Sequence, residues 1–143
     1  MNMTLACISV LLVMPCLLQA QENVSINLSC SEAFLLIQDH MEDTCFVILD
    51  LRPEEMYSKE HIENAIYFDV FSEEFDQWVS SQNKNATYLL YCNMGYRSGI
   101  AMGKMKQLGF KKLYHLHQGI NEWKKQGYKT VSHYYVKLAR DLT

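Results

Sequence analysis

The sequence predicts an α/β domain of three layers, in which helices cover both faces of a central, mainly parallel β-sheet. Residues 45–51 (CFVILDL) form a nearly continuous apolar run, which is typical of a parallel strand buried on both faces. Residues 87–91 (TYLLY) form a second such run. Segments with helical spacing of apolar residues separate the predicted strands, and this alternation is typical of a parallel sheet with crossover helices.

The first expected element is an edge strand over residues 24–28, where polar and apolar residues alternate. Ser29 and Glu32 form the S-x-x-E pattern of a capping box, so a helix is expected to begin there. Three of its apolar residues share one face: Phe34, Ile37 and Met41. Strands are expected next over residues 45–51 and 64–70.

The alternation continues through the second half of the chain. Ser72 is expected to cap a short helix. That helix turns three apolar residues inward: Phe75, Trp78 and Val79. The strand over residues 87–91 leads to a helix over residues 98–108, which Gly109 ends. Its spacing predicts three buried residues: Ala101, Met105 and Leu108.

Three further elements complete the prediction. Residues 112–116 are expected to form the last strand. Ile120 and Trp123 anchor the next helix, which is expected to end at Gly127. A C-terminal helix is expected over residues 131–142.

Composition limits the classes of protein to consider. The chain has 143 residues and a net charge of -3, with 49% apolar and 12% aromatic residues. This length suits one domain with a modest core, and this composition argues against a disordered chain. Charges of both signs are mixed without a run of Lys or Arg, so we expect no nucleic-acid partner.

Residues 1–20 differ from the rest and are interpreted as a signal peptide. Residues 5–18 form an apolar run of 14 residues, which is short for a membrane span. Cleavage near Ala20 would leave residues 21–143 as an exported domain, periplasmic or secreted, with no stable membrane span. Because no Lys or Arg precedes the run, an uncleaved membrane anchor and a mis-assigned start remain alternatives. Cys16 is a weaker candidate for lipid attachment, since Pro15 precedes it.

Cys92 is the candidate nucleophile. It follows the strand over residues 87–91, and a short loop containing Gly95 separates it from the helix expected to begin at Ser98. The unpaired N–H groups and the dipole of a helix N-terminus favour an anion, so the thiol is expected to be held as a thiolate. Loop N–H groups that point inward can also hold a substrate oxyanion.

The remaining cysteines and the histidines are interpreted as structural. Cys30 and Cys45 are expected at opposite ends of one helix, too far apart for a disulfide, and to be small, partly buried residues. His115 and His117 lie near a strand end, but no third ligand clusters with them, so we expect no metal site. His61 is interpreted as structural.

From residue 29 to residue 131 the chain resembles a single-domain rhodanese of the thiosulfate sulfurtransferase family. Four motifs carry the resemblance: the D-x-R of residues 50–52, the aromatic and H-I-x-x-A-I segment of residues 57–66, the active-site loop of residues 92–98, and the G-I-x-x-W of residues 119–123. Three residues replace family glycines, in turns expected to be remote from the cysteine: Glu60, Asn64 and Gln118.

The resemblance implies sulfur transfer without a cofactor. The Cys92 thiolate would take sulfur from thiosulfate or a similar donor, and the persulfide would pass it to cyanide, a thiol or a protein cysteine. The residues implied to form the substrate-binding loop are Asn93, Met94, Gly95, Tyr96, Arg97 and Ser98. Arg97 either binds the oxyanion of the donor or braces the loop, and Asp50 and Arg52 are expected to support the loop.

Two rival functions remain open. A phosphatase or arsenate reductase of related fold would also place Cys and Arg around an anion. Four residues separate Cys92 from Arg97, whereas such phosphatases have a loop longer by one residue, and the shorter loop favours sulfur. A non-catalytic binding module of the rhodanese fold is the other alternative, although such modules typically lack the cysteine.

Overall fold

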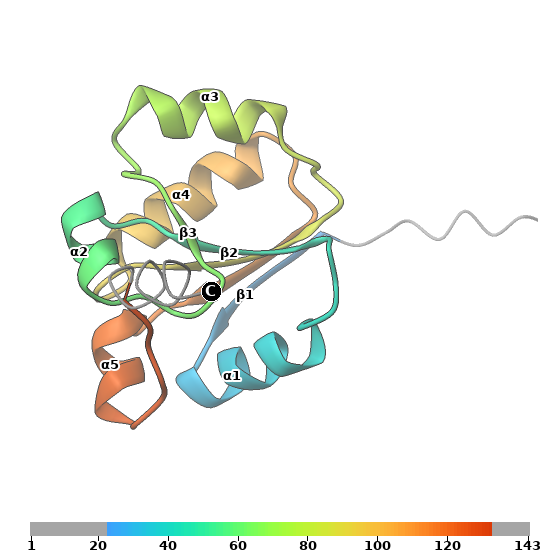
Figure 1. Cartoon of the computed structure of the whole chain (residues 1–143). Helices are drawn as coiled ribbons and strands as arrows, with labels where there is room; N and C mark the ends of the chain where they lie inside the picture. Colours follow the sequence, from blue (N-terminus) through green and yellow to red (C-terminus); the bar gives the residue numbers. More distant parts are fainter. Residues whose placement is uncertain (1–22, 133–143) are drawn as a thin grey trace, which may run out of the picture.

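The computed structural model describes residues 23–132 and has the expected parallel α/β architecture (Figure 1). Its sheet has five strands in the order β1-β5-β4-β2-β3, and every pair is parallel. The strands are β1 (Val24–Leu28), β2 (Phe46–Asp50), β3 (Ile66–Tyr67), β4 (Thr87–Tyr91) and β5 (Lys112–Leu116). The predicted signal peptide and nearly all of the predicted C-terminal helix lie outside the described residues.

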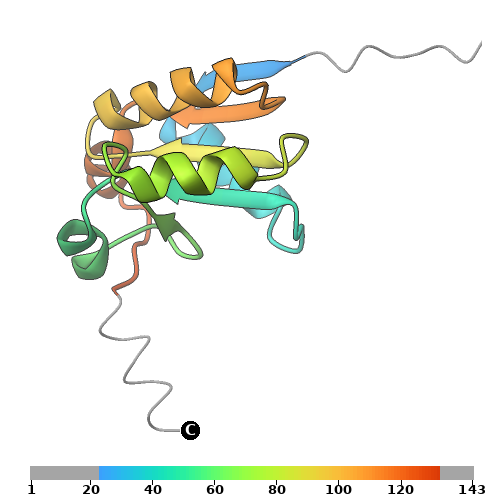
Figure 2. The ribbon, with the colours of Figure 1, turned by 90° about the horizontal axis from the view of Figure 1, so that it is seen from above.

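Helices cover both faces of the sheet and make the molecule three layers thick (Figures 1 and 2). The helices are α1 (Cys30–Asp39), α2 (Glu54–Lys59), α3 (Glu73–Ser81), α4 (Tyr96–Gln107) and α5 (Gly119–Lys125). Helices α3 and α4 lie on one face, and α1 and α5 lie on the other. Within residues 23–132, no helix has the length and apolar character needed to cross a bilayer.

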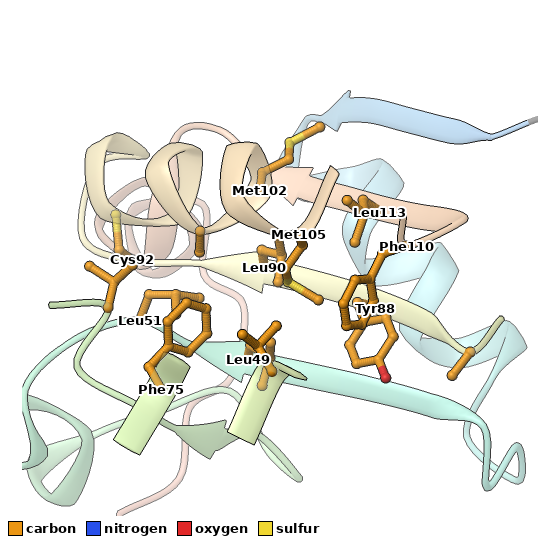
Figure 3. Packing of buried hydrophobic residues seen from close by; sticks show 14 residues of the cluster. Leu49, Leu51, Phe75, Tyr88, Leu90, Cys92, Met102, Met105, Phe110 and Leu113 are labelled. Atoms are coloured by element: carbon orange, nitrogen blue, oxygen red, sulfur yellow. The ribbon is translucent and has the colours of Figure 1, made fainter. Parts of the chain in front are cut away.

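The central strand β4 fixes the direction of the Cys92 side chain. Because side chains alternate along a strand, Tyr88 and Leu90 join Cys92 in the core cluster that contains residues of α3 and α4. Leu89 and Tyr91 belong to the cluster on the opposite face, with residues of α1 and α5. Figure 3 shows the Cys92 sulfur directed toward α4, so the end of a fully buried strand aims it at that helix.

The predicted helix boundaries are confirmed where capping residues define them. The Glu32 side chain accepts a hydrogen bond from the Ser29 N–H at 2.8 Å, and Ser29 caps the Glu32 N–H in return. Ser72 caps α3 through the Phe75 N–H at 3.2 Å. Two predicted helix stops have the left-handed φ that favours glycine: 86° at Gly109 and 83° at Gly127.

The predicted strand over residues 64–70 is wrong in length, because only Ile66–Tyr67 pairs with β2. Asn64 adopts a φ of 64°, a turn conformation that strands do not use. After the strand, Asp69 accepts hydrogen bonds from the Phe71 N–H at 3.1 Å and from the Ser72 N–H at 2.9 Å. These turn contacts replace sheet pairing.

Helix α4 begins at Tyr96, two residues before the predicted start, and α2 was not predicted. Several burial predictions are also wrong. Leu108 is 38% exposed, and Met41 lies beyond the end of α1 and is 64% exposed. Cys45 is exposed, in contrast to the buried Cys30. Amphipathic spacing identifies which face of a helix packs against the sheet, but it does not show whether residues at the ends of the helix are covered by neighbouring elements.

Candidate active site

The Cys92 sulfur lies in a tight backbone pocket between β4 and α4. Its side chain is 3% exposed, and its Sγ accepts a hydrogen bond from the Gly95 N–H at 3.2 Å. Gly95 is the N-cap of α4 and adopts a φ of 91°. A Cβ at this position would lie 2.1 Å from the His117 carbonyl oxygen, so both the conformation and the space require glycine.

The surroundings of Cys92 favour its thiolate form. Burial raises the pKa of the thiol, but hydrogen bonds from the Ser98 side chain and from the N–H groups of Ser98, Met94 and Gly95 lower it by more. The net pKa lies below the ordinary cysteine value. These donors belong to the loop and to the first turn of α4, where a helix favours negative charge. The expectation of a stabilised thiolate from strand, loop and helix order therefore has a geometric basis.

Helix α5 holds the loop backbone from the other side. The Ile120 N–H donates to the Cys92 carbonyl at 2.8 Å, and the Asn121 N–H donates to the Asn93 carbonyl at 3.2 Å. A Cβ on Gly119 would lie 2.3 Å from the Asn93 carbonyl oxygen and 2.5 Å from that of Cys92. The glycine of the G-I-x-x-W motif thus permits close contact with the active-site loop.

The three departures from family glycines are accommodated without a glycine backbone. Gln118 has a φ of -82°, and Glu60 has an extended backbone with a φ of -165°. Asn64 adopts a left-handed conformation that asparagine tolerates. The expected remoteness of all three from the cysteine is wrong for Gln118, because it directly precedes Gly119 at the loop.

Asp50 and Arg52 form a buried ion pair that reaches the loop. The Arg52 guanidinium donates to Asp50 at 2.7 and 2.8 Å, and Tyr91 Oη also donates to Asp50 at 2.8 Å. Burial lowers the Arg52 pKa, whereas the hydrogen bonds and charge of Asp50 raise it by more, so arginine stays charged. Its remaining donors meet Asn93 Oδ1 at 3.4 Å and the Glu60 carbonyl at 2.6 Å. This geometry fits the expected support role.

The outer side of the loop is open. Met94 is 74% exposed and Tyr96 is 76% exposed, so both project away from the thiol. The Arg97 side chain is half-buried, and no hydrogen bond or ion pair to another group of residues 23–132 holds its guanidinium. Of the two arginines near the site, it is therefore Arg52 that braces the loop.

A hydrogen-bonded chain behind Cys92 was not foreseen from the sequence. Ser98 Oγ lies 3.4 Å from Cys92 Sγ and 2.8 Å from His115 Nε2, and His115 Nδ1 lies 3.0 Å from Asn27 Oδ1. On the sequence alone, His115 is interpreted as structural and has no assigned role at the active site. No cluster of three metal-binding side chains occurs in the described part of the chain.

Comparison with known proteins identifies the family. The model of the rhodanese-like domain matches residues 36–126. Thiosulfate sulfurtransferase GlpE of Coxiella burnetii is 31% identical over 78 residues, which cover 54% of this chain and 71% of that protein. A tRNA uridine(34) hydroxylase of Wolbachia sp. subsp. Brugia malayi is 37% identical over 90 residues, which cover 57% of this chain and 33% of that protein. The chain belongs to the rhodanese-like domain family.

Solved structures agree with this assignment at the level of the fold. A rhodanese-related protein of Thermoplasma volcanium superposes with a TM-score of 0.59 at 23% identity, over 75% of this chain and 96% of that chain. The matched region spans only 25–43% of the length of several curated relatives. The comparisons therefore define a domain that also occurs within longer proteins.

Proposed function

We propose that this protein is a sulfurtransferase that carries sulfane sulfur as a persulfide on Cys92. One observation carries the proposal: the buried Cys92 sulfur accepts the Gly95 N–H at the N-terminus of α4. Backbone donors in this position stabilise a negative sulfur in both the thiolate and the persulfide state.

The reaction would proceed in two half-reactions. The Cys92 thiolate attacks the outer sulfur of thiosulfate, a new S–S bond forms, and sulfite leaves with the electron pair of the broken S–S bond. The persulfide anion then lies among the N–H groups of the loop. An acceptor such as cyanide or a thiolate attacks its outer sulfur, forms thiocyanate or a new persulfide, and regenerates the Cys92 thiolate.

Arg97 is proposed to bind the oxygens of the sulfur donor. Its guanidinium has no hydrogen-bonding or ionic partner within residues 23–132, and Arg97 lies in the first turn of α4, between the two residues that donate to the sulfur, Gly95 and Ser98. A planar guanidinium matches two oxygens of a sulfonate-like group. The shortness of the loop, with four residues between Cys92 and Arg97, supports sulfur over a bulkier phosphate as the bound group.

The proposal is tested by intact mass spectrometry. Protein incubated with thiosulfate is expected to gain about 32 Da on Cys92, and to lose it on addition of cyanide or a thiol. The same preparation is expected to show no appreciable hydrolysis of aryl phosphates. Phosphatase turnover without a mass gain would favour the rival enzyme class, and the absence of both would favour a binding module.

Export forms a second part of the proposal. The apolar run of residues 5–18 and the small Ala20 support removal of the first twenty residues. We expect protein expressed in its host to be recovered outside the cytoplasm, with its N-terminus at or near Gln21 by peptide mass mapping. Full-length protein in the cytosol, still carrying residues 1–20, would contradict export. Full-length protein in the membrane fraction would indicate an uncleaved anchor.

A further inference from the structure

The thiol of Cys92 is almost completely shielded from bulk water. Its side chain is 3% exposed, and the adjacent Ser98 is fully buried. The next group, His115, is 7% exposed, and only the fourth, Asn27, lies at the surface of the domain. The four side chains therefore connect the buried sulfur to the surface through hydrogen bonds of 3.4, 2.8 and 3.0 Å.

Four separate elements bring these side chains together. Asn27 on β1 and His115 on β5 are directly paired in the register of the parallel strands. His115 and Leu113 share the side of β5 that faces α4, because residues two apart lie on one face. Ser98, in the first turn of α4, fills the space between His115 and the end of β4.

The direction of each hydrogen bond follows from the chemistry of the groups. Asn27 Oδ1 can only accept, so His115 Nδ1 carries a proton and donates it. In a neutral imidazole this leaves Nε2 as an acceptor, and the Ser98 hydroxyl must donate to it. With that proton directed to Nε2, the Ser98 oxygen can accept the S–H of a neutral Cys92, whereas toward the thiolate the Ser98 hydroxyl donates to Sγ, over a distance of 3.4 Å.

We propose that Asn27, His115 and Ser98 form a proton relay that converts the buried Cys92 thiol into its reactive thiolate. The S–H bond of Cys92 breaks as its proton moves to Ser98 Oγ, and the hydroxyl proton of Ser98 moves to His115 Nε2. The products are a thiolate and an imidazolium, and the hydrogen bonds reverse so that Ser98 now donates to the sulfur. His115 acts through Ser98, as a positioning residue and terminal proton acceptor, and Asn27 fixes its tautomer.

The charged and titratable groups around His115 are consistent with this role. Burial lowers the pKa of its imidazole, a hydrogen bond with the Gly95 backbone opposes this in part, and the charge of His117 adds a smaller lowering effect. It therefore starts neutral and able to accept. The residues that face His115 are Ser98 and Gly99 from α4 and the neutral Asn27 from β1. The titratable Cys92 lies at the end of the neighbouring strand β4. Two cations belong to or reach the active-site loop: Arg97, at the start of α4, and Arg52, which contacts Asn93.

The test uses alkylation of Cys92 by iodoacetamide as a function of pH, followed by peptide mass analysis. The alkylation rate can be measured whether or not the protein transfers sulfur. The relay rests on the proposed function in one respect, namely that Cys92 is the nucleophile. In His115→Gln the amide can still hydrogen-bond to Ser98 but cannot take up a proton. We expect alkylation of Cys92 in this variant to be about tenfold slower than in the wild type at pH 7, because the thiol pKa would be raised by about one unit. At high pH, where the thiol is ionised in both proteins, we expect equal rates.

Two variants make the result decisive. Ser98→Ala removes the middle link and is expected to shift the profile in the same direction, which keeps the relay testable if His115→Gln folds poorly. His40→Gln is the matched control, because His40 lies just past the end of α1, away from the active-site loop, where its ring hydrogen-bonds to the Leu36 carbonyl at 2.9 Å, and its profile is expected to stay close to wild type. A wild-type profile in both His115→Gln and Ser98→Ala would overturn the relay. Persulfide formation from thiosulfate, measured separately, reports on the proposed function alone.

Discussion

Replacing Cys92 with serine is expected to reduce sulfur transfer from thiosulfate to cyanide by about 10⁴-fold or more, to the uncatalysed background. A serine hydroxyl at this position is not ionised near neutral pH and cannot carry a sulfane sulfur. The hydroxyl is close in size to the thiol and can still accept the Gly95 N–H, so the loop is expected to keep its conformation. Thiocyanate formation under saturating thiosulfate measures the effect, and far-UV circular dichroism checks the fold.

The matched control is Cys45→Ser. Cys45 is an exposed, free thiol that precedes β2, at the opposite end of that strand from the active-site loop. Activity in this variant is expected to equal that of the wild type. Equal activity in Cys92→Ser and the wild type would remove the basis for a persulfide enzyme and leave a binding module as the better account.

The order of elements around the nucleophile could be predicted because each element is indicated by residues close together in the sequence. The apolar residues of β4, the glycine at position 95 and the helical spacing beyond it are contiguous in the sequence. In a parallel sheet the carboxyl end of a buried strand is where a ligand binds, so one stretch of sequence was enough to place Cys92. The capping serines Ser29 and Ser72 likewise fixed two helix starts.

Contacts between distant segments could not be predicted in the same way. The relay depends on the register of β1 against β5, which pairs Asn27 with His115 across 88 positions of the sequence. No local pattern in either strand encodes that register. The link from Arg52 to Asn93 spans 41 positions and was expected only because a family motif marked Asp50 and Arg52. Helix α2 has only six residues, too few to show a clear amphipathic period.

The largest expected effect on stability comes from Arg52→Leu. The variant leaves the Asp50 carboxylate, which is fully buried, with the Tyr91 hydroxyl and one backbone N–H as its remaining donors. Breaking a buried ion pair in this way typically costs about 3–5 kcal/mol, because the remaining charge is neither solvated nor neutralised. We expect the urea midpoint to fall with an unchanged m-value. The loop also loses the contact to Asn93, so sulfur transfer is expected to decline in the variant even where it remains folded.

Two comparisons separate the buried charge from a general loss of ion pairing. Lys125→Ala removes an exposed pair with Glu122, in which the lysine side chain is 79% exposed, and is expected to leave the urea midpoint close to that of the wild type, because solvent screens such a pair. The double variant Asp50→Asn with Arg52→Leu removes both charges, while the amide can still accept from Tyr91. It is expected to recover a large part of the stability lost in Arg52→Leu, because no uncompensated charge remains buried. If Arg52→Leu instead costs no more than Lys125→Ala, the Asp50–Arg52 pair does not brace this end of the sheet, and the position of the loop must depend on α5 and the Gly119 contact alone.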